Sequence, residues 1–320
     1  MSFSSQTKDE LVESCKLGST EEKRSLLCGI TRAAGSMTLG RGGIVLQYIT
    51  ENCSVAALTV RLGRELYRVT AETSISEKER LNAVSNVVKF TGDGVRNLLN
   101  DAGYGVDGDE DFELGYIPPR LTDDESKAKA FLRGVFLGAG SVSDPNKGYH
   151  LELVCSYEKF AATLCDIMAG LGISAKFLPR KSSYIVYLKD GELVSDFITL
   201  IGAMNSTMAF EEARVMRSVS NHINRQQNFE DANMNKAAAA AAQQLLDIEF
   251  IRLNAGLDSL PPKLRGAAEL RINNPEATLS DLAEMAEISK SGLNHRLKKL
   301  QQIAKELGLE INDKNKEQVD

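Results

Sequence analysis

The feature that most constrains this chain is an internal repeat. Residues 26–37 read LLCGITRAAGSM and residues 131–142 read FLRGVFLGAGSV. The two motifs share Leu, Gly, Ala, Gly and Ser at matching positions along one constant offset. A repeat followed by the same order of elements predicts two similar halves.

The elements expected after each motif follow one order. The first motif is followed by strand-like stretches at 44–50, 67–72 and 83–90 and by helical stretches at 52–67 and 93–100. The second is followed by strand-like stretches at 150–156, 173–179 and 184–190 and by helical stretches at 158–171 and 192–201. Each half is therefore predicted to be αββαββα, which makes the fold α+β with a pseudo-two-fold axis. The acidic, glycine-bearing loop 103–119 is expected to link the halves.

Small residues lie four apart within each repeated helix. Gly29 is followed by Ala33, and Gly134 by Gly138. Residues at this spacing share one face of a helix, so each helix presents a stripe without large side chains. Two such helices can approach closely, and we expect them to form a pair at the centre of the domain.

This pair of motifs resembles the LAGLIDADG motif of homing endonucleases. In that family each of the two paired helices presents an acidic residue, just before its terminal glycine, that holds a divalent metal at the scissile phosphate. The corresponding residues here, before Gly35 and Gly140, are Ala34 and Ala139. A methyl group cannot ligate a hard cation, so we expect no catalytic residue, no metal and no cofactor. The glycines are then assigned to helix packing alone: Gly29, Gly35, Gly134, Gly138 and Gly140.

The resemblance also implies a saddle formed by the strands, which in homing endonucleases lies along DNA. The strands here carry no dense basic stripe. The main basic candidates are Arg41, Lys147, Arg180 and Lys181, mostly at expected turns. A protein partner or a degenerate ligand site fits this surface as well as DNA does.

Beyond Gly202 the sequence is helical. Thr278 is a good N-cap with Asp281 three residues later, and a short turn at 287–289 precedes a helix from Lys290 to about Leu307. One face of that helix is apolar: Leu293, Leu297, Leu300 and Ala304.

The opposite face of the same helix is polar and basic. Between Glu287 and Glu306 there are five basic residues and no acidic residue. This pattern predicts a helix-turn-helix whose second helix enters the major groove of double-stranded DNA. The residues assigned to DNA contacts are Lys290, Ser291, Asn294, His295, Arg296, Lys298 and Lys299. The alternative is an ordinary solvated face, and the turn lacks the glycine common in such motifs.

Composition excludes several other classes of protein. The net charge of -6 argues against attraction of the whole molecule to nucleic acid or anionic lipid, so binding requires a local basic patch. The five cysteines are scattered, which argues against a disulfide framework or a zinc site. There is no apolar run long enough to span a membrane and no signal peptide, so we expect a cytoplasmic protein without a membrane partner.

Nearly the whole chain resembles the WhiA family of bacterial regulators. The best-matching stretches are Asn224-Arg225, Asn233, Leu260–Leu264 and Ser289–Leu300. The resemblance implies a degenerate LAGLIDADG-like domain, a C-terminal helix-turn-helix, and a role in transcription during sporulation and in cell division.

The sequence therefore predicts a nucleoid-associated regulator that binds promoter DNA and is not an enzyme. We expect a LAGLIDADG-like domain over residues 1–204 with halves of about 1–105 and 120–204, a helical linker or hinge over 205–235, and an all-α helix-turn-helix domain over 236–320. Two alternatives stay open: a scaffold of the division or transcription machinery, and a residual metal-dependent endonuclease using acids such as Asp144 or Glu152.

Overall fold

The computed structural model describes residues 2–15, 18–40, 43–78, 83–105 and 115–317, and the chain divides into two compact units, residues 1–218 and 219–320. Arg41 and most of the linker loop lie outside the described residues. Among the described helices, none combines the length and apolar character required to cross a bilayer.

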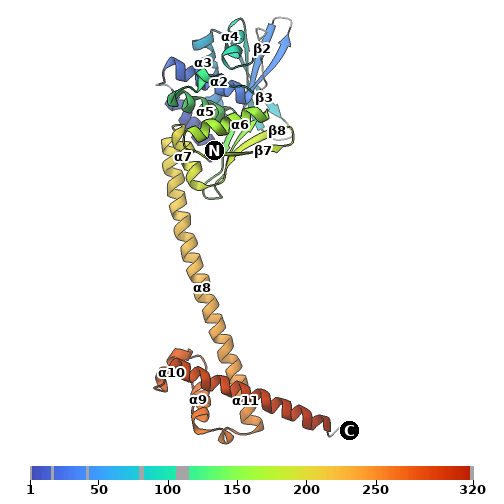
Figure 1. The fold of residues 1–320 in the computed structure, drawn as a ribbon, viewed down its shortest axis with the longest axis vertical. Helices are drawn as coiled ribbons and strands as arrows, with labels where there is room; N and C mark the ends of the chain where they lie inside the picture. The colour runs from blue at the N-terminus through green and yellow to red at the C-terminus, as the bar shows by residue number, and fades with distance from the viewer. Residues whose placement is uncertain (1, 16–17, 41–42, 79–82, 106–114, 318–320) are drawn as a thin grey trace. The chain divides into compact units, whose positions relative to one another are not determined.

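Unit 1 confirms the αββαββα order in both halves (Figure 1). The first half contains α2 (Thr20–Ala34), β1 (Gly35–Gly40), β2 (Gly43–Thr50), α3 (Cys53–Tyr67), β3 (Thr70–Lys78), β4 (Ala83–Thr91) and α4 (Gly94–Asp101). After the short 3-10 helix η2 (Pro119–Leu121), the second half contains α5 (Glu125–Ala139), β5 (Gly140–Val142), β6 (Leu151–Cys155), α6 (Glu158–Gly170), β7 (Lys176–Arg180), β8 (Ser183–Leu188) and α7 (Gly191–Leu200).

Helices α2 and α5 form the predicted central pair. A Cβ added to Gly29 would lie 2.3 Å from the carbonyl oxygen of Phe131, and one added to Gly134 would lie 2.1 Å from that of Leu26. Real side chains do not fit at such distances, so the two backbones touch at these glycines. The reciprocal contacts are what the pseudo-two-fold repeat predicts, and residues 25–32 of α2 are all buried.

The other three glycines have different neighbours. A Cβ on Gly138 would lie 3.1 and 3.3 Å from the Cβ atoms of Ala33 and Ala34, so it is also at the helix contact. Gly35 and Gly140 instead cap the two helices in extended conformation, and their nearest neighbours include the preceding turn of their own helix. These two glycines permit the immediate change from helix to strand.

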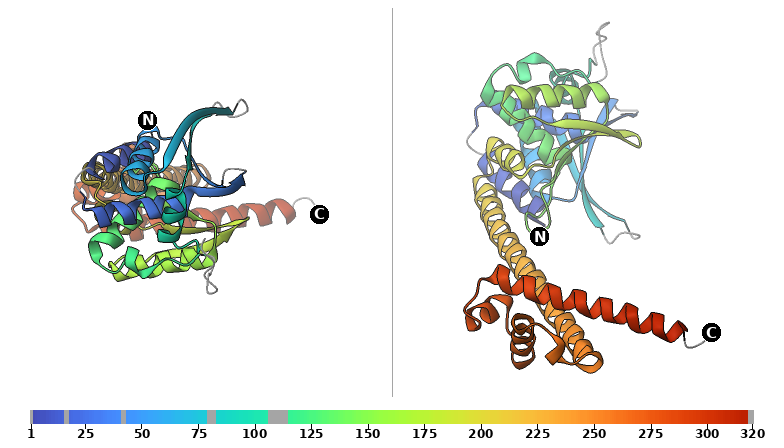
Figure 2. Two further views of the ribbon diagram at one scale, coloured as in Figure 1. Left: turned by 90° about the horizontal axis from the view of Figure 1, so that it is seen from above. Right: turned by 60° about the horizontal axis from the view of Figure 1, so that its bottom comes forward.

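The two sheets have the same antiparallel topology, β1-β2-β4-β3 and β5-β6-β8-β7. Alternate residues of the first sheet face the helices, among them Tyr48 and Phe90, whose rings meet edge to face at 5.2 Å. Figure 2 shows the first sheet's hairpins extending past the helices. Leu39 of β1 and Ile75 of β3 are exposed by 90% and 69%.

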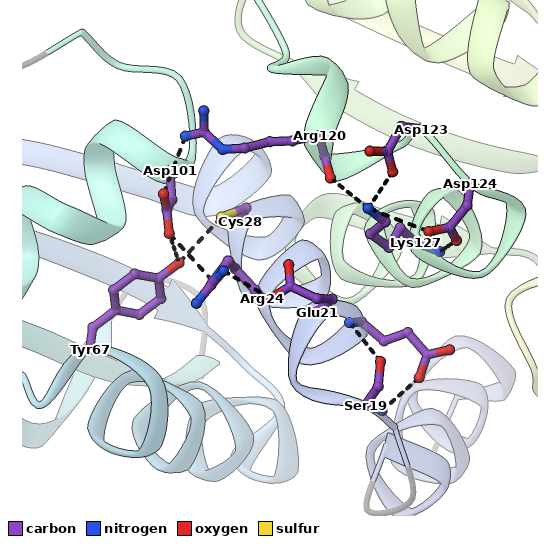
Figure 3. Close-up of polar contacts among 11 residues, drawn as sticks. Ser19, Glu21, Arg24, Cys28, Tyr67, Asp101, Arg120, Asp123, Asp124 and Lys127 are labelled. Atoms are coloured by element: carbon purple, nitrogen blue, oxygen red, sulfur yellow. Dashed lines mark hydrogen bonds and ion pairs between the residues drawn. The ribbon is translucent and has the colours of Figure 1, made fainter.

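A polar network joins the first half to the linker (Figure 3). Asp101 accepts a hydrogen bond from the Tyr67 hydroxyl at 2.7 Å and pairs with Arg120 at 3.2 Å and Arg24 at 3.5 Å. The Cys28 thiol lies 4.0 Å from the same hydroxyl. Burial raises the pKa of Tyr67 and raises the pKa of Cys28 to about 12, so both remain protonated at neutral pH.

Helix α1 (Phe3–Ser14) was not predicted from the sequence. Its Thr7 and Leu11 side chains are buried against the domain. Its Glu10 carboxylate accepts hydrogen bonds from the backbone N–H groups of Asn205 at 2.6 Å and Ser206 at 2.8 Å. This carboxylate therefore caps the first turn of α8, a cap that comes from a distant part of the chain.

Helix α8 (Met204–Asn254) is continuous and runs through the whole of the expected linker or hinge, residues 205–235. Every residue from 218 to 240 is exposed, so the helix there depends on local propensity. The run of alanines at 237–242 strengthens that propensity at the end of the stretch. Unit 2 also contains α9 (Pro262–Asn273), α10 (Leu279–Met285) and α11 (Lys290–Glu317). Helix α11 continues beyond the predicted end near Leu307.

The glycine contact between α2 and α5 leads to a test. Gly29→Ala should lower the free energy of unfolding of unit 1 by about 3 kcal/mol, because the added methyl group forces two backbones apart. Urea denaturation followed by circular dichroism measures the loss. Gly170→Ala on α6 is the matched control, since a Cβ there meets open space, and it should change stability by less than about 0.5 kcal/mol. Equal stability of the two variants would contradict the backbone contact.

Candidate nucleic-acid interface

The residues assigned to DNA contacts in the sequence all lie on α11. The helix begins after Ser289, whose hydroxyl accepts a hydrogen bond from the Gly292 N–H at 3.1 Å. Leu293, Leu297 and Leu300 are each 1% exposed and pack with residues of α8, α9 and α10. The apolar stripe is therefore confirmed as the side of α11 that faces the core of unit 2.

Most of the side chains assigned to DNA contacts on α11 are exposed. Lys290, Ser291, His295, Lys298 and Lys299 are exposed, and Asn294 and Arg296 are half-buried. Lys299 Nζ contacts Gln302 Oε1 at 3.3 Å, and Ser291 contacts the Ser289 hydroxyl at 3.1 Å. Within the described part of α11, none of the basic side chains forms an ion pair with a carboxylate. Their positive charge is available to an external anion.

The turn between α10 and α11 is closed by a residue that the sequence did not single out. Glu287 has a left-handed backbone with φ of 51°. The Glu287 N–H donates to the Glu284 carbonyl and the Ile288 N–H to the Ala283 carbonyl, each at 3.0 Å. This is the Schellman arrangement, in which glycine normally occupies the left-handed position. A glutamate at this position adopts the left-handed conformation less favourably than a glycine would, but the geometry of the turn is the same.

A buried arginine supports the helix-turn-helix from behind. Arg271 of α9 is 2% exposed. Its guanidinium donates to the Gln244 side chain at 3.0 Å and to the Ala277 carbonyl at 2.7 Å. It joins α8 to the loop before α10, and burial lowers its pKa. Nothing in its sequence surroundings distinguished it from a surface arginine.

The two positions of the lost carboxylates lie together in unit 1. Ala34 and Ala139 end α2 and α5, both are half-buried, and Ala34 is beside Gly138. The nearby Arg32 is 6% exposed and lies between the rings of Tyr104 and Phe160, at 4.6 and 5.4 Å from their centroids. Burial lowers the pKa of Arg32. None of these side chains is a carboxylate.

The acids considered as substitutes are engaged elsewhere. Asp144 accepts hydrogen bonds from the backbone and side chain of Asn146, at 3.0 and 3.1 Å, within its own turn. Glu152 contacts His150 Nε2 at 2.6 Å and Arg180 at 3.4 Å. Over the residues that the structure describes, no group of three or more His, Cys, Asp or Glu side chains could hold a metal ion.

The sheet faces turned away from the helices carry mixed charge. One row of paired residues across the first sheet is Ser36, Gln47, Lys89 and Glu72. The equivalent row across the second sheet is Ser141, Glu152, Tyr187 and Lys176. Each row has one basic and one acidic residue, so neither resembles the positive surface that a DNA backbone requires.

Three family models match consecutive parts of the chain. The WhiA N-terminal LAGLIDADG-like domain matches residues 20–103, the WhiA LAGLIDADG-like domain matches 128–220, and the WhiA C-terminal HTH domain matches 223–304. A protein of Clostridium tetani named probable cell division protein WhiA is 38% identical over 98% of this chain and 100% of its own length. The chain belongs to the WhiA family. A Pediococcus pentosaceus relative of the same name is also 38% identical, over 96% of this chain and 99% of its own.

A solved WhiA structure shares the fold. Full-length WhiA from Thermatoga maritima matches with a TM-score of 0.56 and 24% identity, covering 96% of this chain and 99% of that one. The WhiA family models thus confirm a LAGLIDADG-like α+β region followed by a helix-turn-helix domain.

The left-handed turn of this WhiA family member can be tested by mutation. Glu287→Gly should raise the stability of unit 2 by about 1 kcal/mol, because glycine adopts a positive φ without strain. Glu284→Gly, one turn earlier in α10, is the matched control and should lower stability by about 1 kcal/mol. Thermal unfolding of both variants measures the difference. Shifts in the same direction would show that the conformation of residue 287 does not govern this turn.

Proposed function

We propose that this chain is a sequence-specific DNA-binding transcription regulator without nuclease activity. The observation that carries the proposal is the polar face of α11, whose basic side chains lack acidic partners within its described part, in a chain of net charge -6. A solvated surface helix normally mixes charges of both signs. The relatives' name, probable cell division protein, supports a role in cell division, and the family resemblance implies one in sporulation.

The residues of α11 divide by their place along the helix. Ser291, Asn294 and His295 lie in its first turns, where base-edge contacts concentrate in helix-turn-helix proteins. Lys290, Arg296, Lys298 and Lys299 supply the charge for phosphates. In this proposal the protein acts in the cytoplasm, at the nucleoid, on promoter DNA.

We also propose where the domains and the linker of the chain lie. Residues 1–204 and 236–320 each supply an apolar core, Phe210 adds to the first of these cores, and residues 205–235 form a helical linker. The exposure of every residue from 218 to 240 supports a linker, because no tertiary contact protects that part of α8.

The proposed contacts predict two kinds of variant. Lys298→Ala or Lys299→Ala should weaken binding to specific and random duplexes alike and lower the salt slope by about one for each phosphate that is no longer neutralised. Asn294→Ala or His295→Ala should cost about 1–3 kcal/mol at the specific site and little on random DNA. Binding is measured across a salt series, with specific duplexes taken from selected genomic fragments.

Two further variants serve as controls. Lys263→Ala removes an equal charge from the exposed start of α9 and should leave the salt slope unchanged. Leu297→Ala should lose binding through unfolding, by about 2–5 kcal/mol of core packing. If the Lys298 and Lys299 variants bind every duplex like the parent, α11 is a solvated face and a scaffold role becomes the better interpretation.

We expect no DNA cleavage, because Ala34 and Ala139 replace the metal-binding carboxylates. Supercoiled plasmid incubated with the purified protein and Mg²⁺ or Mn²⁺ should remain intact. Metal-dependent nicking that chelation abolishes would favour the endonuclease alternative. Ala34→Asp combined with Ala139→Asp should destabilise the metal-free protein, since it places two like charges at half-buried neighbouring helix ends.

A further inference from the structure

The outer face of α3 is strongly basic. Arg61, Arg64 and Arg68 follow one another at spacings of three and four residues, which places them on one face of the helix and its cap. All three are exposed. Arg68 ends α3 in a left-handed conformation with φ of 54°, which glycine would adopt with less strain.

A groove lies between this face and β3. Its cavity of about 620 Å³ is lined by Ala57, Val60, Arg61, Arg64, Glu65 and Thr73. Ala57 and Val60 are the apolar residues of its lining, and Arg61 and Arg64 are the basic ones. Arg68 lies outside the lining, at the end of the same helix. Glu65 is held by an ion pair of 2.8 Å with Lys23, so its carboxylate does not neutralise the arginines.

The groove adjoins an open sheet edge, because β3 is an outer strand of its sheet. Arg64 Nη2 donates to the Ala71 carbonyl at 3.0 Å, so this carbonyl points away from β4. In an antiparallel strand the N–H and C=O of one residue point to the same side, and alternate residues repeat that direction. Thr73 and Ile75 therefore also turn their backbone groups outward, and Ile75 is 69% exposed.

The repeat supplies an internal comparison. At the constant offset of the two motifs, the α6 residues matching Arg61 and Arg64 are Asp166 and Ala169. Both of these are exposed as well. The fold therefore does not require arginines at this place, and the basic groove is a property of the first half alone.

We infer that the groove between α3 and β3 docks an extended, acidic segment of a partner protein. The segment adds a strand to the open edge of β3, where the outward backbone groups of Thr73 and Ile75 pair with it. Its carboxylates alternate with apolar side chains, so only one of the two sets faces α3. In that set the glutamate methylene groups cover Ala57 and Val60, and the carboxylates meet Arg61 and Arg68.

The same arginines could attract a DNA backbone, but the groove suits a peptide better. A duplex would place phosphates on the arginines, leave the apolar lining uncovered and make no use of the strand edge. The inference is independent of DNA binding by α11, and its test leaves that helix unchanged.

The test uses the full chain and a labelled ten-residue peptide in which glutamate alternates with valine. Binding is followed by fluorescence anisotropy, with the lysine-for-glutamate peptide as the probe control. Arg61→Ala combined with Arg68→Ala should weaken binding about fivefold, the effect of two partly exposed ion pairs. Arg64 is kept because it bonds the strand.

The strand edge is tested separately by Thr73→Pro, which removes an outward N–H without breaking the ladder to β4. This variant should weaken binding at least threefold, whereas Thr73→Val, which keeps the N–H, should bind like the parent. Lys176→Ala combined with Lys189→Ala removes the same charge from the second half and should also have no effect. Thermal unfolding checks that each variant is folded.

Three results would overturn the inference. The first is failure of the acidic peptide to bind, or equal binding of the lysine peptide. The second is parental affinity in the double arginine variant. The third is a double arginine variant that loses affinity for a random DNA duplex but binds the peptide unchanged. This result would assign the groove to DNA.

Discussion

Unit 1 depends on two backbones touching. At Gly29 and Gly134 the α2 and α5 main chains approach so closely that a single methyl group would collide with a carbonyl oxygen. This contact brings the two halves together and sets which faces of both helices are buried. The apolar residues around the contact can be replaced by other apolar residues, but the contact itself requires glycine at both positions.

The same motif contains two positions, residues 34 and 139, that do not require glycine. Ala34 and Ala139 are adjacent to the capping glycines, are half-buried, and have room for a side chain. In the homing endonucleases that these motifs resemble, these are the positions that carry the metal ligands. Because the packing residues and the chemical residues are distinct, a LAGLIDADG-like domain can keep its architecture without the carboxylates. The exposed surfaces of unit 1 can then serve functions other than DNA cleavage.

The repeat and the helix-turn-helix could be predicted because each depends on local pattern. Glycine spacing, strand alternation and the Thr278 cap are all short-range signals, and the structure confirms the elements they predicted. The cap that Glu10 provides to α8 could not be predicted, since it joins residues far apart in the sequence. Glu287 and Arg271 were missed for a similar reason: a left-handed glutamate and a buried arginine are produced by tertiary contacts that outweigh their ordinary preferences.

Burial makes the Cys28 thiol unreactive. A thiol reacts as its thiolate, and burial raises the pKa of Cys28 to about 12, so the side chain stays protonated at pH 7. The side chain is also fully buried beside the helix pair. Oxidants and alkylating reagents can reach it only when unit 1 opens. The rate at which Cys28 is modified therefore measures how often unit 1 opens.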